Sequence, residues 1–287
     1  MTRIIDSLSE ISAGYGALFC DLWGCLHNGR AFYPAAAAAL QDFRRNGGRV
    51  ALVTNAPRPQ QLVQEQLARM GVPRDCWDVI VTSGDAAQDA MLSGHVGQRV
   101  WHLGPEKDHG FFTGIADPRA EAITRVPLDQ AEGIVATGPF DDLTETPEDY
   151  RDRLQDALAR GLPMLCANPD IVVDLGETRL YCAGAIAELY EQMGGRALYF
   201  GKPHAPIYDL ARRQLGVGPG LPALAIGDGI GTDIAGGVAQ GIDSLFVTGG
   251  LAAAEMGPDV EHPDPALLRE WLALQGIHPT WAIGRLR

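Results

Sequence analysis

Short apolar runs that end in a polar residue recur along the chain. Continuous apolar runs of this length are typical of strands that are buried on both faces in a parallel sheet. The sequence therefore predicts four such strands, each with a polar last residue and with glycine or proline close behind. They are GALFCD (16–21), GRVALVTN (48–55), RALYFGK (196–202) and PALAIGD (222–228).

Helical patterns lie between these runs. Residues 34–45 are rich in alanine, and residues 59–70 and 207–215 place apolar side chains at helical spacing. Alternation of buried strands with amphipathic helices is typical of an α/β fold with a doubly wound parallel sheet. We therefore expect a doubly wound α/β domain similar to a Rossmann fold.

Polar side chains stand at the carboxyl ends of the predicted strands. In a doubly wound sheet, ligands bind beyond these ends. Four residues that are distant in the sequence should therefore converge on one edge of the sheet: Asp21, Thr54, Lys202 and Asp228.

The middle of the chain contains a second set of α/β elements. Residues 79–92 predict one more strand and helix, and residues 132–193 repeat the alternation, with a helix starting near Thr146. Residues 56–201 are far more than a loop between two motifs requires. We predict a discontinuous core domain, 1–97 and 195–287, and an inserted α/β cap domain, 98–194. Residues 243–250 and 265–274 predict a last strand and helix.

Composition and charge narrow the classes of partner. The chain has 287 residues, 46% of them hydrophobic, and a formal net charge of −13. This charge disfavours nucleic acid and an anionic membrane as partners. The first residues lack the apolar stretch of a signal peptide. The five cysteines are scattered, with no C-x-x-C spacing. These features favour a reducing cytoplasm and give no sign of a disulfide framework.

The polar strand ends have the chemistry of a phosphate site. Thr54 and Asn55 offer a hydroxyl and an amide to phosphoryl oxygens, and Lys202 supplies a point charge. Asp228 and Asp233 lie in the glycine-rich segment GDGIGTD. Carboxylate oxygens are ligands that Mg²⁺ prefers.

In this order, the motifs resemble those of the haloacid dehalogenase (HAD) superfamily. They are D-x-x-G-x-L at 21–26, T-N at 54–55, G-K-P at 201–203 and G-D-x-x-x-T-D at 227–233. The long insertion, with ANPD at 167–170 and GAIAELYE at 184–191, resembles the class IIA branch, which includes NagD-like and nitrophenylphosphatase-like enzymes. The resemblance covers nearly the whole chain and implies a Rossmann-like core with an α/β cap.

The resemblance also implies roles for single residues. Asp21 would be the nucleophile that forms an aspartyl-phosphate, and Lys202 would steady the charges of the carboxylate and the phosphate. Thr54 and Asn55 would bind the phosphoryl group. Mg²⁺ would be held by Asp21, the backbone carbonyl of Trp23 and Asp228, with Asp233 orienting the loop or a metal-bound water.

Trp23 departs from the pattern of the family's phosphatases, which usually carry a second aspartate there as general acid and base. An indole N–H donates a hydrogen bond but does not exchange a proton at neutral pH. Losing a general acid removes about 10²–10⁴ in rate. His27 is the nearest titratable candidate to replace it, and a polar packing role for this histidine is the alternative.

Three functions remain open at this stage. The first is a Mg²⁺-dependent phosphohydrolase acting on a small phosphorylated metabolite. The second is a phosphate-binding or weakly active relative without its general acid. The third is a dehalogenase, whose halide leaves without a proton. A dinucleotide site fits poorly, because GDGIG lacks the spacing G-x-G-x-x-G.

Two further expectations concern the cap. Asn168, Asp170 and Tyr181 are candidates for choosing the substrate. Self-association through the cap is common among NagD-like proteins, so the resemblance implies a homodimer.

Overall fold

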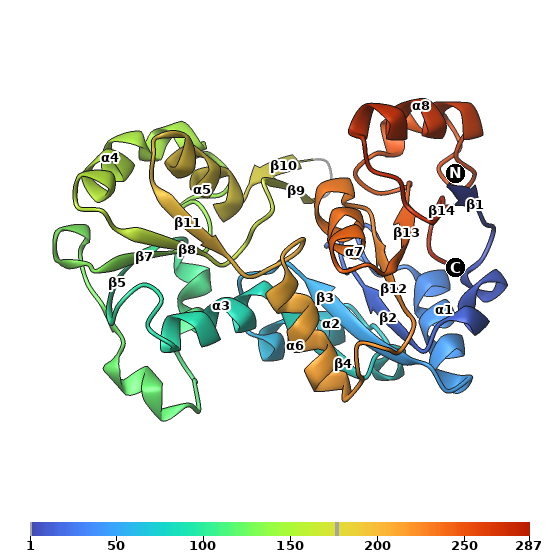
Figure 1. The fold of residues 1–287 in the computed structure, drawn as a ribbon, viewed down its shortest axis with the longest axis horizontal. Helices are drawn as coiled ribbons and strands as arrows, with labels where there is room; N and C mark the ends of the chain where they lie inside the picture. The colour runs from blue at the N-terminus through green and yellow to red at the C-terminus, as the bar shows by residue number, and fades with distance from the viewer. Residues whose placement is uncertain (1, 176–177) are drawn as a thin grey trace. The chain divides into compact units, whose positions relative to one another are not determined.

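The computed structural model describes residues 2–175 and 178–287 and divides into two compact units. Unit 1 comprises residues 1–54, 63–81 and 202–287, and unit 2 comprises residues 55–62 and 82–201. Each unit is built around its own parallel sheet (Figure 1). Among the described helices, none combines the length and the apolar composition needed to cross a bilayer.

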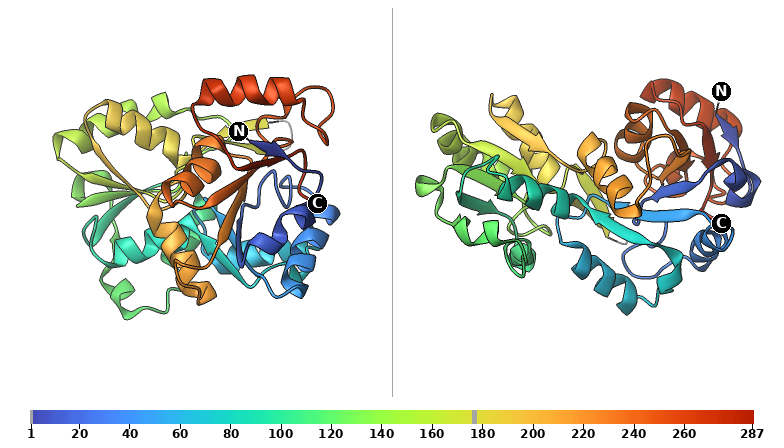
Figure 2. Two further views of the ribbon diagram at one scale, coloured as in Figure 1. Left: turned by 45° about the vertical axis from the view of Figure 1, so that its right-hand side comes forward. Right: turned by 60° about the horizontal axis from the view of Figure 1, so that its bottom comes forward.

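Unit 1 holds a seven-stranded sheet of order β1-β14-β13-β12-β2-β3-β4. Every strand pair whose register is described is parallel. Both termini lie at the β1–β14 edge of this sheet, as the two views of Figure 2 show. The strands are β1 (Arg3–Ile4), β2 (Ala17–Cys20), β3 (Arg49–Thr54), β4 (Val79–Thr82), β12 (Ala223–Gly227), β13 (Asp243–Val247) and β14 (Trp281–Ile283).

The order of these strands contains a topological switch point. The chain passes from β2 to β3 and β4 on one side, and later from β12 to β13 and β14 on the other side of β2. The carboxyl ends of β2 and β12 therefore flank the crevice where a doubly wound sheet binds its ligand.

Helices cover the sheet of unit 1. Ile207, Tyr208 and Ala211 of α6 form one buried cluster with side chains of β2, β3 and β4. Near the other end of the sheet, the ring of Phe246 on β13 stacks on Trp271 of α8, with 5.5 Å between centroids. The helices are α1 (Pro34–Arg45), α2 (Gln60–Arg69), α6 (Ala205–Leu215), α7 (Ala235–Ala239) and α8 (Pro265–Gln275).

Unit 2 holds a five-stranded sheet of order β11-β8-β7-β5-β6, in which all four pairs are parallel. A separate antiparallel pair is formed by β9 (Val172–Leu175) and β10 (Thr178–Tyr181). The strands of the larger sheet are β5 (Arg99–Leu103), β6 (Thr124–Arg125), β7 (Gly133–Ala136), β8 (Pro163–Cys166) and β11 (Arg196–Tyr199).

Two apolar clusters lie on the faces of the unit 2 sheet. One joins α3 (Ser83–Leu92) to Val100 and Val135, and the other joins α4 (Arg151–Ala159) and α5 (Ala183–Gln192) to Leu103 and Ile134. Side chains alternate along a strand, so neighbouring residues of β5 face different clusters. The hydroxyl of buried Tyr190 donates to the carbonyl of Leu162 at 2.7 Å.

The predicted α/β fold class is confirmed, and the structure corrects one predicted strand. Residues 196–202 were expected as a strand of the core, but β11 pairs with β8 in unit 2. The apolar pattern of a strand does not identify its sheet, because partners are chosen by tertiary packing. The predicted domain bounds of 98 and 194 stay a prediction, and unit 2 itself runs further in both directions.

Short or weakly patterned strands were not predicted. These include β5 and β6, which lie in a segment where glycine and proline interrupt the apolar pattern. The cysteines are free and buried.

Candidate active site

Asp21 and Asp228 lie at the switch point of the unit 1 sheet. Asp21 directly follows β2 and Asp228 directly follows β12. The two strand ends are joined at this place, since the backbone N–H of Asp21 donates to the carbonyl of Ile226 at 2.8 Å. Both carboxylates are buried.

Lys202 connects two carboxylates of this site. Its Nζ lies 2.7 Å from Asp21 Oδ1 and 2.6 Å from Asp233 Oδ1. All three side chains are almost completely shielded from solvent. Ion pairs in such surroundings are screened by salt much less than surface pairs. Asp21, Lys202 and Asp228, which come from distant motifs, therefore lie together in unit 1, and the predicted place of Thr54 beside them stays a prediction.

Asp21, Asp228 and Asp233 form a compact cluster of acids. Each offers an oxygen that lies within 4.8 Å of the others. Asp228 also accepts the N–H of Leu251 at 3.0 Å. Burial, and then the negative charges of Asp21 and Asp233, raise the pKa of Asp228 well above its usual value. A positive charge placed among these oxygens would offset both effects.

Two glycines make room for the Asp228 carboxylate. A Cβ at Gly24 would lie 1.9 Å from Asp228 Oδ2, and a Cβ at Gly250 would lie 2.1 Å from the same atom. Gly24 also has a φ of +71°, which side chains other than glycine rarely adopt. Gly250 was missed in the sequence, where its only signal is the Gly-Gly pair that ends the last predicted strand.

These residues fit a divalent cation. Three ionised carboxylates and one ammonium would leave two negative charges uncompensated in a buried place. Oxygen ligands of this kind suit Mg²⁺ or Ca²⁺. The predicted contribution of the Trp23 carbonyl to this site stays a prediction.

Thr54 and Asn55 follow each other at the end of β3, and both are buried. Thr54 belongs to unit 1, whereas Asn55 begins the first segment of unit 2. There the amide of Asn55 donates to Asp170 Oδ1 at 2.8 Å, and the N–H of Asp170 donates to Asn168 Oδ1 at 3.1 Å. Two of the three residues that we expected to select substrate are thus linked to Asn55.

Trp23 and His27 lie together in the loop after β2. Their rings meet edge to face, with 5.2 Å between centroids. The N–H of Gly29 donates to His27 Nδ1 at 3.0 Å, so this nitrogen carries no proton. Burial lowers the pKa of His27 to about 4. The ring is therefore neutral at pH 7, which is a poor state for a proton donor.

Comparison with known proteins places this site in a family. A family model of haloacid dehalogenase-like hydrolases matches residues 18–115, and a related model of HAD-like hydrolases matches residues 199–273. A crystal structure of a haloacid dehalogenase-like hydrolase from Brucella suis is 38% identical to this chain. The match covers 99% of this chain and 100% of the other, with a TM-score of 0.84.

More distant relatives share the fold. The p-nitrophenyl phosphatase of Archaeoglobus fulgidus is 19% identical, with a TM-score of 0.71 over 94% of this chain and 96% of the other. NagD of E. coli is 21% identical, with a TM-score of 0.67 over 93% and 95%.

Two curated relatives match over most of their length. The 5'-nucleotidase YutF of Bacillus subtilis is 25% identical over 90% of this chain and 98% of its own. An acid sugar phosphatase of Staphylococcus epidermidis is 26% identical over 84% and 89%. The two family models and the Brucella relative together show that the chain belongs to the haloacid dehalogenase-like hydrolases.

Proposed function

We propose that this hydrolase is a metal-dependent phosphatase that acts on a small phosphorylated metabolite through an aspartyl-phosphate on Asp21. The observation that carries the proposal is the buried ammonium of Lys202, held 2.7 Å from Asp21 and 2.6 Å from Asp233. The phosphatase activities named for the curated relatives support the same reaction class.

Each side chain has a task in this reaction. Asp21 supplies the attacking oxygen, because its carboxylate stands at the carboxyl end of the sheet beside a fixed positive charge. Lys202 stabilises negative charge that builds on the phosphoryl oxygens. Thr54 provides a hydroxyl donor to these oxygens, and the same role for Asn55 stays a prediction. Burial of the cluster keeps bulk water away and strengthens these interactions.

We assign Asp21, Asp228 and Asp233 as the residues that hold or orient a divalent cation, which we propose to be Mg²⁺. When bound, the cation supplies positive charge that offsets the acids and the phosphoryl group. Asp233 contacts Lys202 and accepts the N–H of Gly229 at 3.2 Å, so we assign it an orienting role.

Because Trp23 stands where a general acid would be, the site suits substrates whose leaving group needs no proton. Its indole cannot protonate the leaving oxygen, and His27 is neutral with its Nδ1 occupied. We therefore propose acyl phosphates, anhydrides or aryl phosphates as the preferred class. The same observation supports a second candidate function, a relative that binds a phosphorylated ligand with little turnover.

A panel of phosphate esters separates the two functions. We expect turnover of nitrophenyl phosphate and of an acyl phosphate with Mg²⁺, its loss in EDTA and its return when Mg²⁺ is added. Turnover should also be lost in Asp21→Asn. Absence of turnover on every ester, together with tight binding of one of them, would instead establish the binding function. Unchanged turnover in Asp21→Asn would exclude the proposed nucleophile.

The homodimer and the cytoplasmic location stay predictions. Sedimentation equilibrium of the purified chain tests the first, and fractionation of cells that express it tests the second.

A further inference from the structure

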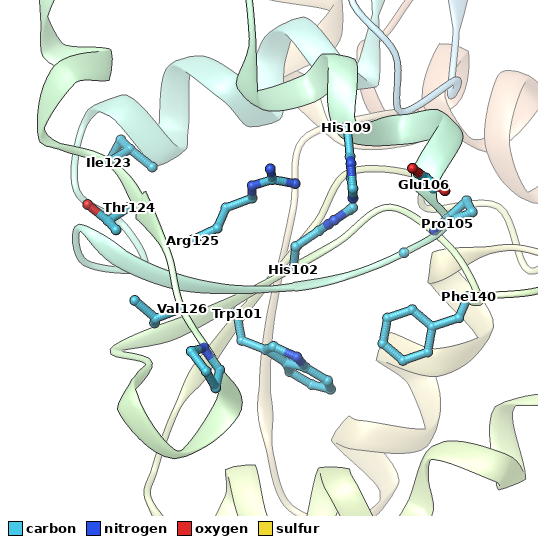
Figure 3. A pocket seen from close by; sticks show the side chains of 12 residues that line it. Trp101, His102, Pro105, Glu106, His109, Ile123, Thr124, Arg125, Val126 and Phe140 are labelled. Atoms are coloured by element: carbon cyan, nitrogen blue, oxygen red, sulfur yellow. The ribbon is translucent and has the colours of Figure 1, made fainter.

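Unit 2 contains a cavity of about 810 Å³ that involves no residue of the acid cluster. This volume lies within the range of small-molecule sites, about 300–1,000 Å³. Figure 3 shows its lining side chains, which come from β5, from the segment that contains β6, and from the segments that follow β5 and β7.

The cavity lies at the switch point of the unit 2 sheet. The chain passes from β5 to β6 on one side and then to β7, β8 and β11 on the other side of β5. The ends of β5 and β7 are joined, because the N–H of Thr137 donates to the carbonyl of Leu103 at 2.9 Å. Gly104 and Phe140, which line the cavity, come from the segments just after these strands. Sheets of this topology bind ligands at this place.

The short pairing of β6 with β5 leaves space for the cavity beside β5. The N–H groups of Thr124 and Val126 donate to the carbonyls of Gln98 and Val100. Within the described residues, no further main-chain hydrogen bond joins the β6 segment to β5 beyond Val100. The segment therefore leaves the sheet edge where Trp101 and His102 begin to line the cavity.

Side chains that carry nitrogen donors gather on one side of β5 (Figure 3). The rings of His102 and His109 are 5.5 Å apart. The guanidinium of Arg125 lies 5.3 Å from the ring centroid of Phe112, against which His102 also packs at 5.0 Å. One acid, Glu106, is among the lining residues. Burial, and then the neighbouring His109 and Arg125, lower the pKa of His102 to about 4, so this imidazole is neutral at pH 7 and offers hydrogen bonds. The guanidinium of Arg125 supplies the positive charge, which favours an anionic group at this side of the cavity.

His102 is held in place by Thr137, a residue that does not itself line the cavity. Its Nε2 lies 2.9 Å from Thr137 Oγ1, and the hydroxyl of Thr137 also bonds buried Asp108. A Cβ at Gly104 would lie 1.9 Å from Thr137 Oγ1 and 2.7 Å from His102 Nε2. This close fit requires glycine, and it presents the imidazole in a fixed orientation.

Aromatic side chains line the other side of β5 (Figure 3). Trp101 and Phe140 meet edge to face with 6.4 Å between their centroids. The guanidinium of Arg153 lies 5.3 Å from the ring centroid of Phe140, which is 37% exposed. An exposed aromatic beside a tryptophan provides a surface on which a planar ring can pack.

We propose that this cavity binds a small organic anion that carries a planar ring, of the size and chemistry of a nucleoside monophosphate. The anion would lie against Arg125, His102 and His109, and the ring against Trp101 and Phe140. A guanidinium suits phosphate because it presents several donors in one plane. The cavity is therefore a ligand site of unit 2, in addition to the proposed phosphatase site of unit 1.

Adenosine 5'-monophosphate is the probe for this site. Binding is measured by calorimetry on the whole chain in EDTA, so that hydrolysis does not consume the probe. We expect saturable binding that Arg125→Gln weakens at least ten-fold. Arg151→Gln is the matched control, because Arg151 is an exposed arginine of unit 2 that pairs with Glu148 outside the cavity. Absence of binding, or equal loss in both variants, would overturn the proposal.

A second pair of variants separates this site from the phosphatase site. Binding should persist in Lys202→Met and weaken several-fold in Phe140→Ala. The side-chain resonances of His102 and His109 should shift during the titration, and those of exposed His262 should not. If Lys202→Met abolishes binding and Arg125→Gln leaves it unchanged, the probe occupies the phosphatase site only. The present proposal then fails while the proposed function stands.

Discussion

The carboxyl ends of β2 in unit 1 and β5 in unit 2 occupy the same topological position in their sheets but carry different chemistry. In each sheet, a main-chain hydrogen bond joins the two strand ends at the switch point. The N–H of Asp21 after β2 donates to β12 in unit 1, and the N–H of Thr137 after β7 donates to β5 in unit 2. Acids and a lysine follow in unit 1, whereas imidazoles, an arginine and aromatic rings follow in unit 2. One architecture thus supports two kinds of site.

The two places also share a use of glycine. Gly24 and Gly250 leave room for the Asp228 carboxylate, and Gly104 leaves room for the Thr137–His102 hydrogen bond. In both units, the missing Cβ lets polar side chains approach the backbone closely. The comparison indicates that close packing around the strand ends fixes the polar groups, while residue type decides which ligand they suit.

Of the changes considered, removal of the nucleophile should reduce phosphatase turnover the most, and it should leave the unit 2 site intact. Asp21→Asn keeps the size of the side chain but removes the charge that pairs with Lys202. We expect turnover of nitrophenyl phosphate to fall by about 10⁴–10⁶-fold, as for other covalent nucleophiles. Binding of adenosine monophosphate in EDTA should change by less than two-fold. A comparable loss of both properties would show that the two sites are not independent.

Restoring an acid at position 23 should have the next largest effect. In Trp23→Asp, we expect turnover of an alkyl phosphate to rise by about 10²-fold, since a general acid contributes about 10²–10⁴. Turnover of an acyl phosphate should rise less, because its leaving group needs no proton and only the attack of water on the aspartyl-phosphate gains from the new carboxylate. Trp23→Asn is the control for loss of the indole. An equal gain in Trp23→Asn would mean that removal of bulk, and not the acid, causes the increase.

Adding a Cβ at residue 104, in Gly104→Ala, tests the unit 2 site alone. The added Cβ of Gly104→Ala would overlap Thr137 Oγ1, so the hydrogen bond to His102 must shift. Overpacking of this kind costs about 1–3 kcal/mol in the free energy of unfolding, which denaturant titration measures. We expect roughly ten-fold weaker binding of adenosine monophosphate and nearly unchanged phosphatase turnover per folded molecule. Unaltered binding would contradict the role given to this network.

His27→Ala should have the smallest effect. We expect turnover to fall by a few-fold, and by the same factor on nitrophenyl phosphate and on an alkyl phosphate, because the neutral ring packs on Trp23 and fixes Gly29. A much larger loss on the alkyl phosphate would establish His27 as the leaving-group acid. Thermal unfolding of the variant separates a packing defect from a catalytic one.

Much of unit 1 could be predicted from the sequence. The helix expected at residues 34–45 has those bounds in the structure, and the apolar runs before Asp21 and Asp228 are the strands β2 and β12. These segments are strongly patterned, so burial of their apolar side chains decides their conformation locally. The polar ends of the predicted strands then identify Asp21, Thr54, Lys202 and Asp228 as candidates, and the glycine-rich segment 227–233 adds Asp233.

Unit 2 was harder to predict. Its strand β6 has two residues, and β5 carries Trp101 and His102, whose half-buried side chains break the apolar pattern. The cavity combines six residues between Trp101 and His109 with residues 123–127 and Phe140, and these segments share no motif. No signal in the sequence relates Thr137 to His102, because the bond between them depends on the pairing of β5 with β7.

The sequence by itself determined the alternation of strands and helices, the family motifs and the missing acid at Trp23. Each of these features depends only on residues that are close together in the sequence. Only the tertiary structure decided that β11 joins the sheet of unit 2, that Gly250 accommodates Asp228, and that Arg125, His102 and Phe140 line one cavity. These relations depend on strand order and side-chain packing between distant segments, which local patterns do not encode.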